Sequence, residues 1–239
     1  MGDMKTLIIG GATGIGFAVA QALSGREGVI VLAGRDAAKL AAAKARLNGT
    51  TKVETRTLDI AEEAQVAQLA HAVGPVDNII VTAGSQAPGG ALAQLDLGAA
   101  KQAFDTKFWG SIAVARHLSG IVRPGGTLTL TSGFLARRAM PGAFVKTAMN
   151  AALEATVKVL ARELAPLRVN AVSPGLTDTE AYAGMTQQAR RQMLERASAT
   201  LPAGRFGRAE DVARGYLFIL DNPFVTGTVL DIEGGALIN

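Results

Sequence analysis

Short apolar runs alternate with longer segments of helical periodicity along the whole chain. Several of these runs are continuously apolar, as expected for strands that are covered on both faces. The predicted strands are 6–9, 28–33, 52–58, 78–82, 126–131, 168–173 and 229–232. The predicted helices are 14–24, 36–47, 62–73, 97–118, 143–164 and 209–220. This order predicts an α/β fold with a doubly wound parallel sheet of about seven strands flanked by helices, which is the Rossmann fold.

No break in composition and no Pro/Gly/Ser-rich linker divides the chain, so residues 1–239 are expected to form a single domain. One polar segment at about 177–201 departs from the strand–helix rhythm between the sixth and seventh predicted strands. We interpret it as a mobile lid over a ligand. The alternative is an ordinary helical excursion on the surface.

Composition narrows the function classes. The chain has no cysteine, which excludes disulfides and thiolate metal sites. Its basic residues are scattered along the chain and do not form the basic stripe expected of a nucleic-acid-binding protein. The net charge of +4 suits a phosphorylated ligand instead. No apolar run approaches the ~18 residues of a membrane span, and the N-terminus leaves no room for a signal peptide. We therefore expect a cytoplasmic protein with no membrane or nucleic-acid partner.

A glycine-rich loop follows the first predicted strand and precedes a helix. Its glycines are Gly10, Gly14 and Gly16, and Thr13 and Ile15 lie between them. One glycine allows a tight turn, one lets the backbone approach a pyrophosphate, and one lets helix and sheet pack closely. The N-terminus of the following helix offers free N–H groups and a positive dipole end to the phosphates. The loop therefore predicts a dinucleotide site.

The end of the second predicted strand indicates which dinucleotide is bound. A site that prefers NAD usually carries an acidic residue there for the ribose 2′-hydroxyl, but this chain has Gly34 followed by Arg35. A guanidinium holds the 2′-phosphate of NADP through two parallel hydrogen bonds. Asp36 is interpreted as the cap of the next helix. We therefore expect NADP(H) rather than NAD(H), the alternative being that Arg35 is a solvated surface residue.

At this point the chain resembles the short-chain dehydrogenase/reductase family over essentially its whole length. The glycine spacing matches, although Ile9 stands where threonine is usual. Ala83-Gly84 resembles the end of the family's Asn-Asn-Ala-Gly motif, with Val81 and Thr82 replacing both asparagines. The run from Arg168 through Pro174-Gly175 resembles the segment that holds the nicotinamide carboxamide. The resemblance adds Asp59, Ala83, Gly84, Pro174, Gly175, Thr177 and Thr179 to the predicted cofactor residues.

The reactive centre departs from the family. Family members carry a serine, a Tyr-x3-Lys pair on the following helix, and an asparagine on the preceding long helix. Ser132 matches the serine, but aligning the run Ala151 to Leu164 places Lys146 at the tyrosine position and Asn150 at the lysine position. Lys107 stands where the family has asparagine. The predicted catalytic residues are therefore Lys107, Ser132, Lys146 and Asn150.

Either catalysis was lost and polar residues drifted in, or the site was rebuilt. We favour a rebuilt site, because lysine and asparagine have exchanged places between positions 107 and 150. Two neighbouring lysines in a partly desolvated pocket repel each other, which lowers the pKa of at least one of them. Lys146 would then donate a proton to a carbonyl oxygen that Ser132 also holds, and Asn150 would orient Lys146 or a ribose hydroxyl.

Three functions follow from these patterns. The leading prediction is an NADP(H)-dependent oxidoreductase that acts on a small-molecule carbonyl or alcohol substrate. The alternatives are a catalytically inactive NADP(H)-binding sensor or scaffold, and a lyase or isomerase with a lysine base. No histidine pair or acidic cluster suits a metal, so no metal site is expected. By resemblance alone, a homodimer or homotetramer is expected.

Overall fold

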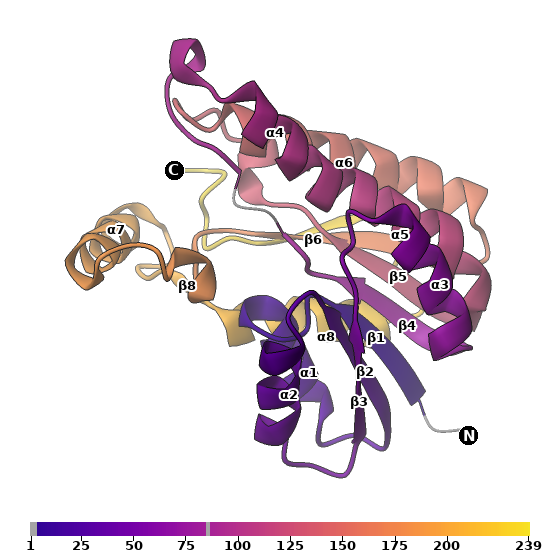
Figure 1. Ribbon diagram of the computed structural model, residues 1–239. Coiled ribbons are helices and arrows are strands. Elements are labelled where there is room, and N and C mark those ends of the chain that lie inside the picture. The colour runs from indigo at the N-terminus through magenta and orange to yellow at the C-terminus, as the bar shows by residue number, and fades with distance from the viewer. Residues whose placement is uncertain (1–3, 85–86) are drawn as a thin grey trace.

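The computed structural model describes residues 4–84 and 87–239 and shows a seven-stranded sheet between two layers of helices (Figure 1). The strands are β1 (Met4–Ile9), β2 (Gly28–Gly34), β3 (Lys52–Thr57), β4 (Val76–Val81), β5 (Val122–Thr131), β6 (Arg168–Pro174) and β9 (Val229–Ile232). Their order is β3-β2-β1-β4-β5-β6-β9, and every neighbouring pair is parallel. The predicted Rossmann fold is confirmed.

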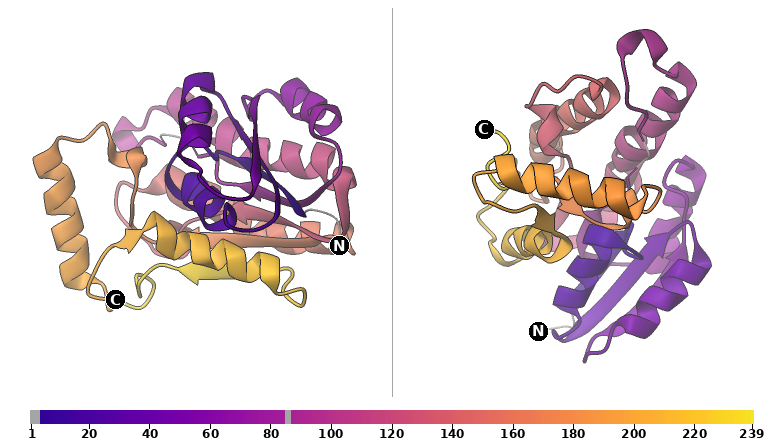
Figure 2. Two further views of the ribbon diagram at one scale, coloured as in Figure 1. Left: turned by 90° about the horizontal axis from the view of Figure 1, so that it is seen from below. Right: turned by 90° about the vertical axis from the view of Figure 1, so that its left-hand side faces the viewer.

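Apolar side chains from the two faces of the sheet build two cores. The helices are α1 (Gly14–Leu23), α2 (Ala37–Arg46), α3 (Glu63–Val73), α4 (Leu97–Phe104), α5 (Gly110–Leu118), α6 (Phe144–Glu163), α7 (Gln187–Thr200) and α8 (Ala209–Asp221). One core lies between the sheet and α1, α2 and α8, and the other between the sheet and α3, α5 and α6 (Figures 1 and 2). Because side chains alternate along a strand, neighbouring residues of β1 enter different cores: Ile8 packs with the first set of helices and Leu7 with the second.

The predicted helix 97–118 is interrupted. A π-helical turn, η2 (Asp105–Trp109), separates α4 from α5, and Lys107 lies in its middle. Such turns occur as single insertions in helices and are frequent at functional sites. The described residues also contain single 3₁₀ turns, which are η1 (Leu92–Gln94), η3 (Ser119–Ile121), η4 (Phe134–Ala136) and η5 (Glu180–Tyr182).

The segment predicted as a lid contains β7 (Thr177–Asp178), η5 and α7. β7 pairs with β8 (Gly207–Arg208) in a small second sheet. Helix α7 stands apart from both helical layers (Figure 2), and Leu194 is the only buried residue among Gln187–Thr200. Few apolar contacts hold α7 to the domain, which suits a lid; its mobility stays a prediction.

The parallel order brings the carboxyl ends of β1 and β4 together at the point where the direction of chain winding reverses. Ligands of open α/β sheets bind at this switch point. Over residues 4–84 and 87–239, no helix is both long and apolar enough to cross a bilayer.

Candidate functional site

The glycine loop closes tightly against the end of β4. Gly10 has a φ of +91°, and a Cβ atom built there would lie 2.5 Å from the backbone nitrogen of Ala83. A Cβ atom at Gly16 would collide with the carbonyl oxygen of Gly10. Both positions therefore require glycine, one for the turn and the other for the close approach of α1.

The N-terminus of α1 offers unpaired donors. Thr13 is the N-cap residue, but its side chain accepts no N–H of the helix. The N–H group of Gly14 donates to Glu180 Oε2 over 2.8 Å. The N–H groups of Ile15 and Gly16 have no partner within residues 4–84 and 87–239. Free donors at the positive end of a helix fit the pyrophosphate of a dinucleotide.

A cavity of about 470 Å³ runs along the carboxyl ends of β1, β2 and β4. Most of the predicted cofactor residues line it: Gly10, Thr13, Gly14, Ile15, Gly16, Arg35, Ala83, Gly84 and Thr179. These residues are far apart in the sequence and meet only because the strands are parallel. The cavity thus unites the glycine loop with the end of the second strand, as a dinucleotide requires.

The end of the cavity beside β2 is basic. Arg35 and Lys39 both line it. Asp36 Oδ1 accepts the Lys39 N–H over 3.0 Å, so Asp36 is the N-cap of α2, which confirms the cap prediction. Within the described residues, Arg35 forms no ion pair, and its guanidinium remains available for a phosphate monoester.

Four predicted cofactor residues, Asp59, Pro174, Gly175 and Thr177, do not line this cavity, and Gly175 lines a separate one. Asp59 Oδ1 accepts the Ala61 N–H over 3.0 Å in a local turn. Pro174 is buried at the end of β6, and Thr177 is buried with its hydroxyl donating to the carbonyl oxygen of Gly175 over 3.0 Å. Their positions reflect local hydrogen bonding and packing, and no contact of these residues with the cavity is seen.

The structure brings three of the four predicted reactive residues together from three elements. Lys107 comes from η2, Ser132 follows β5, and Asn150 lies on α6. Lys107 Nζ donates to Asn150 Oδ1 over 2.6 Å and to the carbonyl oxygen of Ser132 over 3.0 Å. An ammonium group has three donors, and the third has no acceptor in the described part of the chain.

Burial perturbs the Lys107 ammonium. The pKa of Lys107 is lowered from 10.5 to about 8, chiefly by desolvation on burial and also by the positive charge of Lys146, while the carboxylate of Glu154 opposes the shift. Lys146 itself is exposed, one helical turn before Asn150, and its side chain forms no ion pair or hydrogen bond within residues 4–84 and 87–239. The two lysines thus lie close enough to repel each other, as the sequence suggested, and the lowered pKa belongs to Lys107.

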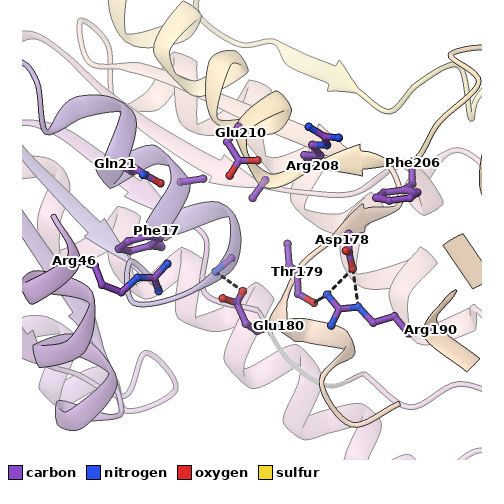
Figure 3. Close-up of a pocket in the computed structure, with 13 residues that line it drawn as sticks. Phe17, Gln21, Arg46, Asp178, Thr179, Glu180, Arg190, Phe206, Arg208 and Glu210 are labelled. Carbon is purple, nitrogen blue, oxygen red and sulfur yellow. Dashed lines mark hydrogen bonds and ion pairs between the residues drawn. The ribbon is translucent and has the colours of Figure 1, made fainter. Parts of the chain in front are cut away.

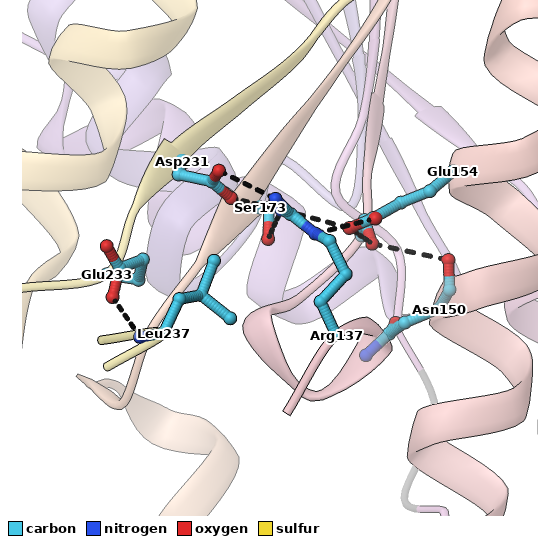
Figure 4. Close-up of polar contacts among 8 residues, drawn as sticks. Arg137, Asn150, Glu154, Ser173, Asp231, Glu233 and Leu237 are labelled. Carbon is cyan, nitrogen blue, oxygen red and sulfur yellow. Dashed lines mark hydrogen bonds and ion pairs between the residues drawn. The ribbon is translucent and has the colours of Figure 1, made fainter. Parts of the chain in front are cut away.

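The Ser132 hydroxyl belongs to a second polar network. It donates to Glu154 Oε1 over 2.8 Å, and Glu154 Oε2 lies 3.0 Å from Arg137 Nε. Arg137 also pairs with Asp231 (Figure 4). Two carboxylates therefore hold the Arg137 guanidinium beside Ser132.

Sequence reasoning missed Glu154 and Glu180. Glu154 lies four residues after Asn150 on α6, so the two share one helix face, and this spacing was an available signal. For Glu180 no local pattern was available, since its partner Gly14 is 166 positions away. No three side chains of the metal-binding kinds converge in the described residues.

Comparisons with known proteins agree with this geometry. Residues 10–236 match the family model described as "Enoyl-(Acyl carrier protein) reductase". The chain is 31% identical to the short-chain dehydrogenase/reductase malC of Malbranchea aurantiaca, covering 98% of this chain and 94% of that one. It is 30% identical to L-xylulose reductase of Mesocricetus auratus, covering 98% and 96%. A crystal structure of a small-chain dehydrogenase in complex with NADPH is 42% identical, with a TM-score of 0.87 and coverage of 99% and 100%.

Proposed function

The chain belongs to the short-chain dehydrogenase/reductase family of oxidoreductases, and we propose that it is an NADP(H)-dependent member with a lysine-centred reactive site. The cofactor assignment is supported by the basic end of the cavity, which Arg35 and Lys39 line. The acidic residue at that end is Asp36, and its carboxylate caps α2 instead of standing free for a ribose hydroxyl. The NADPH complex of the 42% identical dehydrogenase points the same way. Bound NADPH would supply the hydride.

The observation that carries the proposed chemistry is the 2.6 Å contact between Lys107 Nζ and Asn150 Oδ1. In relatives with the usual motif, the lysine stands at position 150 and the asparagine at position 107. Here the exchanged pair still meets, so the site keeps an ammonium beside α6 although a different helix supplies it. Drift after loss of catalysis gives no reason for the two changes to compensate each other.

We assign distinct roles to the polar groups. Asn150 and the Ser132 carbonyl hold the Lys107 ammonium, whose third N–H stabilises negative charge on the substrate oxygen. Lys146, at the tyrosine position and open to water, donates the proton to that oxygen and is reprotonated from solvent. Because the Ser132 hydroxyl donates to Glu154, a carbonyl oxygen finds its donors on the lysines instead.

The test is NADPH consumption with a panel of aldehydes, ketones and quinones by the purified protein and by Lys146→Met. We expect the variant to bind NADPH normally and to lose at least about 100-fold in kcat, the usual contribution of a general acid. Lys158→Met removes an exposed lysine from the same helix and controls for the change in net charge. Retained turnover in Lys146→Met overturns the assignment of the proton donor.

One observation favours a second function, a non-catalytic NADP(H) sensor. The Ser132 hydroxyl is engaged by Glu154 and the Lys107 ammonium is tied to backbone and amide oxygens, as in a purely structural network. A sensor binds NADPH but turns over no carbonyl in the panel, and Lys146→Met leaves its cofactor affinity unchanged.

A further inference from the structure

We propose that the Glu180 carboxylate competes with the cofactor pyrophosphate for the N-terminus of α1, and so sets the affinity for the dinucleotide while holding the lid against the glycine loop. This inference rests on the cofactor assignment above, but not on the lysine chemistry. Glu180 lies in η5, the first turn of the lid segment, and Gly14 is the first residue of α1 (Figure 3).

The contact joins a negative charge to the positive end of a helix. Glu180 Oε2 accepts the Gly14 N–H over 2.8 Å. The first turn of α1 contains no acidic residue, and Thr13 provides no side-chain cap. Glu180 therefore supplies from the lid the carboxylate that helix N-termini favour.

Glu180 is held in place by its neighbours in the chain. Arg190, on α7, donates through Nε to Asp178 Oδ1 over 2.8 Å and also donates to the carbonyl oxygen of Thr179. These bonds fix the two residues that precede Glu180 and tie α7 to them. Thr179 also packs on the glycine loop, since its Cβ would lie 3.4 Å from a Cβ built at Gly14. The first turn of the lid thus lies directly on the loop.

A carboxylate and a phosphate cannot share this position. Glu180 lines the cofactor cavity together with Gly14, Ile15 and Gly16. A pyrophosphate that approaches these N–H groups needs the same Gly14 donor and is repelled by the carboxylate. Binding therefore releases Glu180 from Gly14, and because Glu180 belongs to the lid, cofactor binding and lid position are coupled.

A second cavity provides the matched control. It also has a volume of about 470 Å³, and Gly14, Thr179 and Glu180 line both cavities (Figure 3). Glu210, in the first turn of α8, lines this cavity but forms no bond to the glycine loop. Glu210→Gln and Glu180→Gln change the net charge equally, and only the second alters the contact.

The experiment measures NADPH affinity by the fluorescence of the bound nucleotide, and hydrogen exchange of residues 177–200 without nucleotide. We expect Glu180→Ala to bind NADPH about three- to fivefold more tightly, the fold-change that corresponds to losing one carboxylate at a helix N-terminus. Glu180→Gln shifts affinity in the same direction by less, and Glu210→Gln leaves it unchanged. Exchange in 177–200 accelerates in Glu180→Ala and not in Glu210→Gln.

The contrary outcomes are distinct. Weaker or unchanged NADPH binding by Glu180→Ala shows that Glu180 does not compete with the pyrophosphate. Unchanged hydrogen exchange in residues 177–200 shows that the Glu180–Gly14 contact does not hold the lid. Both results leave the proposed function intact, because the wild-type protein still binds NADPH. Failure of every form to bind NADPH overturns the cofactor assignment together with this inference. A misfolded variant is recognised by exchange that accelerates throughout the sheet rather than in the lid alone.

Discussion

Replacing Lys107 by methionine should remove a specific pH dependence from the stability of this protein. The folded-state pKa of Lys107 is about 8, whereas its ordinary value is 10.5. Between these values the unfolded chain binds more protons than the folded one, so the free energy of unfolding rises with pH. The penalty for burying the ammonium is fully present below pH 8 and is relieved as the pH rises from 8 towards 10.5.

The size of the effect follows from the two pKa values. Each pH unit within this window changes the unfolding free energy by about 1.4 kcal/mol, so the wild-type protein gains about 1.3 kcal/mol from Lys107 between pH 7 and pH 9. Groups that do not interact with Lys107 titrate equally in Lys107→Met. The difference between the two proteins therefore reports Lys107 together with its charged neighbours Lys146 and Glu154.

The assay is urea denaturation of wild type, Lys107→Met and Lys158→Met at pH 7 and pH 9. We expect the wild-type protein to gain about 1.3 kcal/mol relative to Lys107→Met on going to the higher pH. Lys158→Met, which removes an exposed lysine of α6, should follow the wild-type protein. A stability difference between wild type and Lys107→Met that is independent of pH would refute the argument, since Lys107 would then ionise as it does in the unfolded chain.

Two further predictions concern the cofactor and the core. Arg35→Ser should weaken NADPH binding about tenfold and leave NADH binding unchanged in a fluorescence titration, because a guanidinium is the phosphate-binding group at that end of the cavity; equal losses for both nucleotides would contradict the role. Tyr216→Phe should lower the unfolding free energy by about 1 kcal/mol, since the buried hydroxyl donates to Thr131 Oγ1 over 2.6 Å while Thr131 itself donates to Val81. Tyr182→Phe, at the chain's other tyrosine, is the control in the same denaturation series, and an equal loss there would contradict the buried bond.

The fold and the cofactor loop could be predicted because their determinants are local. Each strand is a short apolar run, and the glycine loop encodes its own turn, so neighbouring residues suffice. The proposed exchange between positions 107 and 150 rests on comparing two separate helical segments with the family pattern. The π-helical turn η2 could not be predicted, because Ala100, Phe104 and Phe108 keep the spacing of an ordinary helix across it.

The missing parts of the site depend on distant partners. The direction of the Ser132 hydroxyl is set by Glu154, which arrives 22 residues later on α6. The acceptor of the Gly14 N–H group is Glu180, which lies 166 residues further along the chain. Acidic residues on polar helical segments carry no sequence signal for such roles, since the same residues are common on solvated surfaces. Only the packing of elements shows which carboxylates accept these hydrogen bonds.

The wide turn at η2 gives the site a dependence on helix register. Successive residues of an α-helix are about 100° apart around its axis, and a π-turn is one residue longer than the α-helical turn it replaces. Removing one residue from Asp105–Trp109 would restore a continuous helix and rotate one side of it by about that angle relative to the other. Either Lys107 would swing away from Asn150, or α4 would lose its own packing. The one extra residue in η2 thus decides whether the Lys107 ammonium can reach Asn150 on α6.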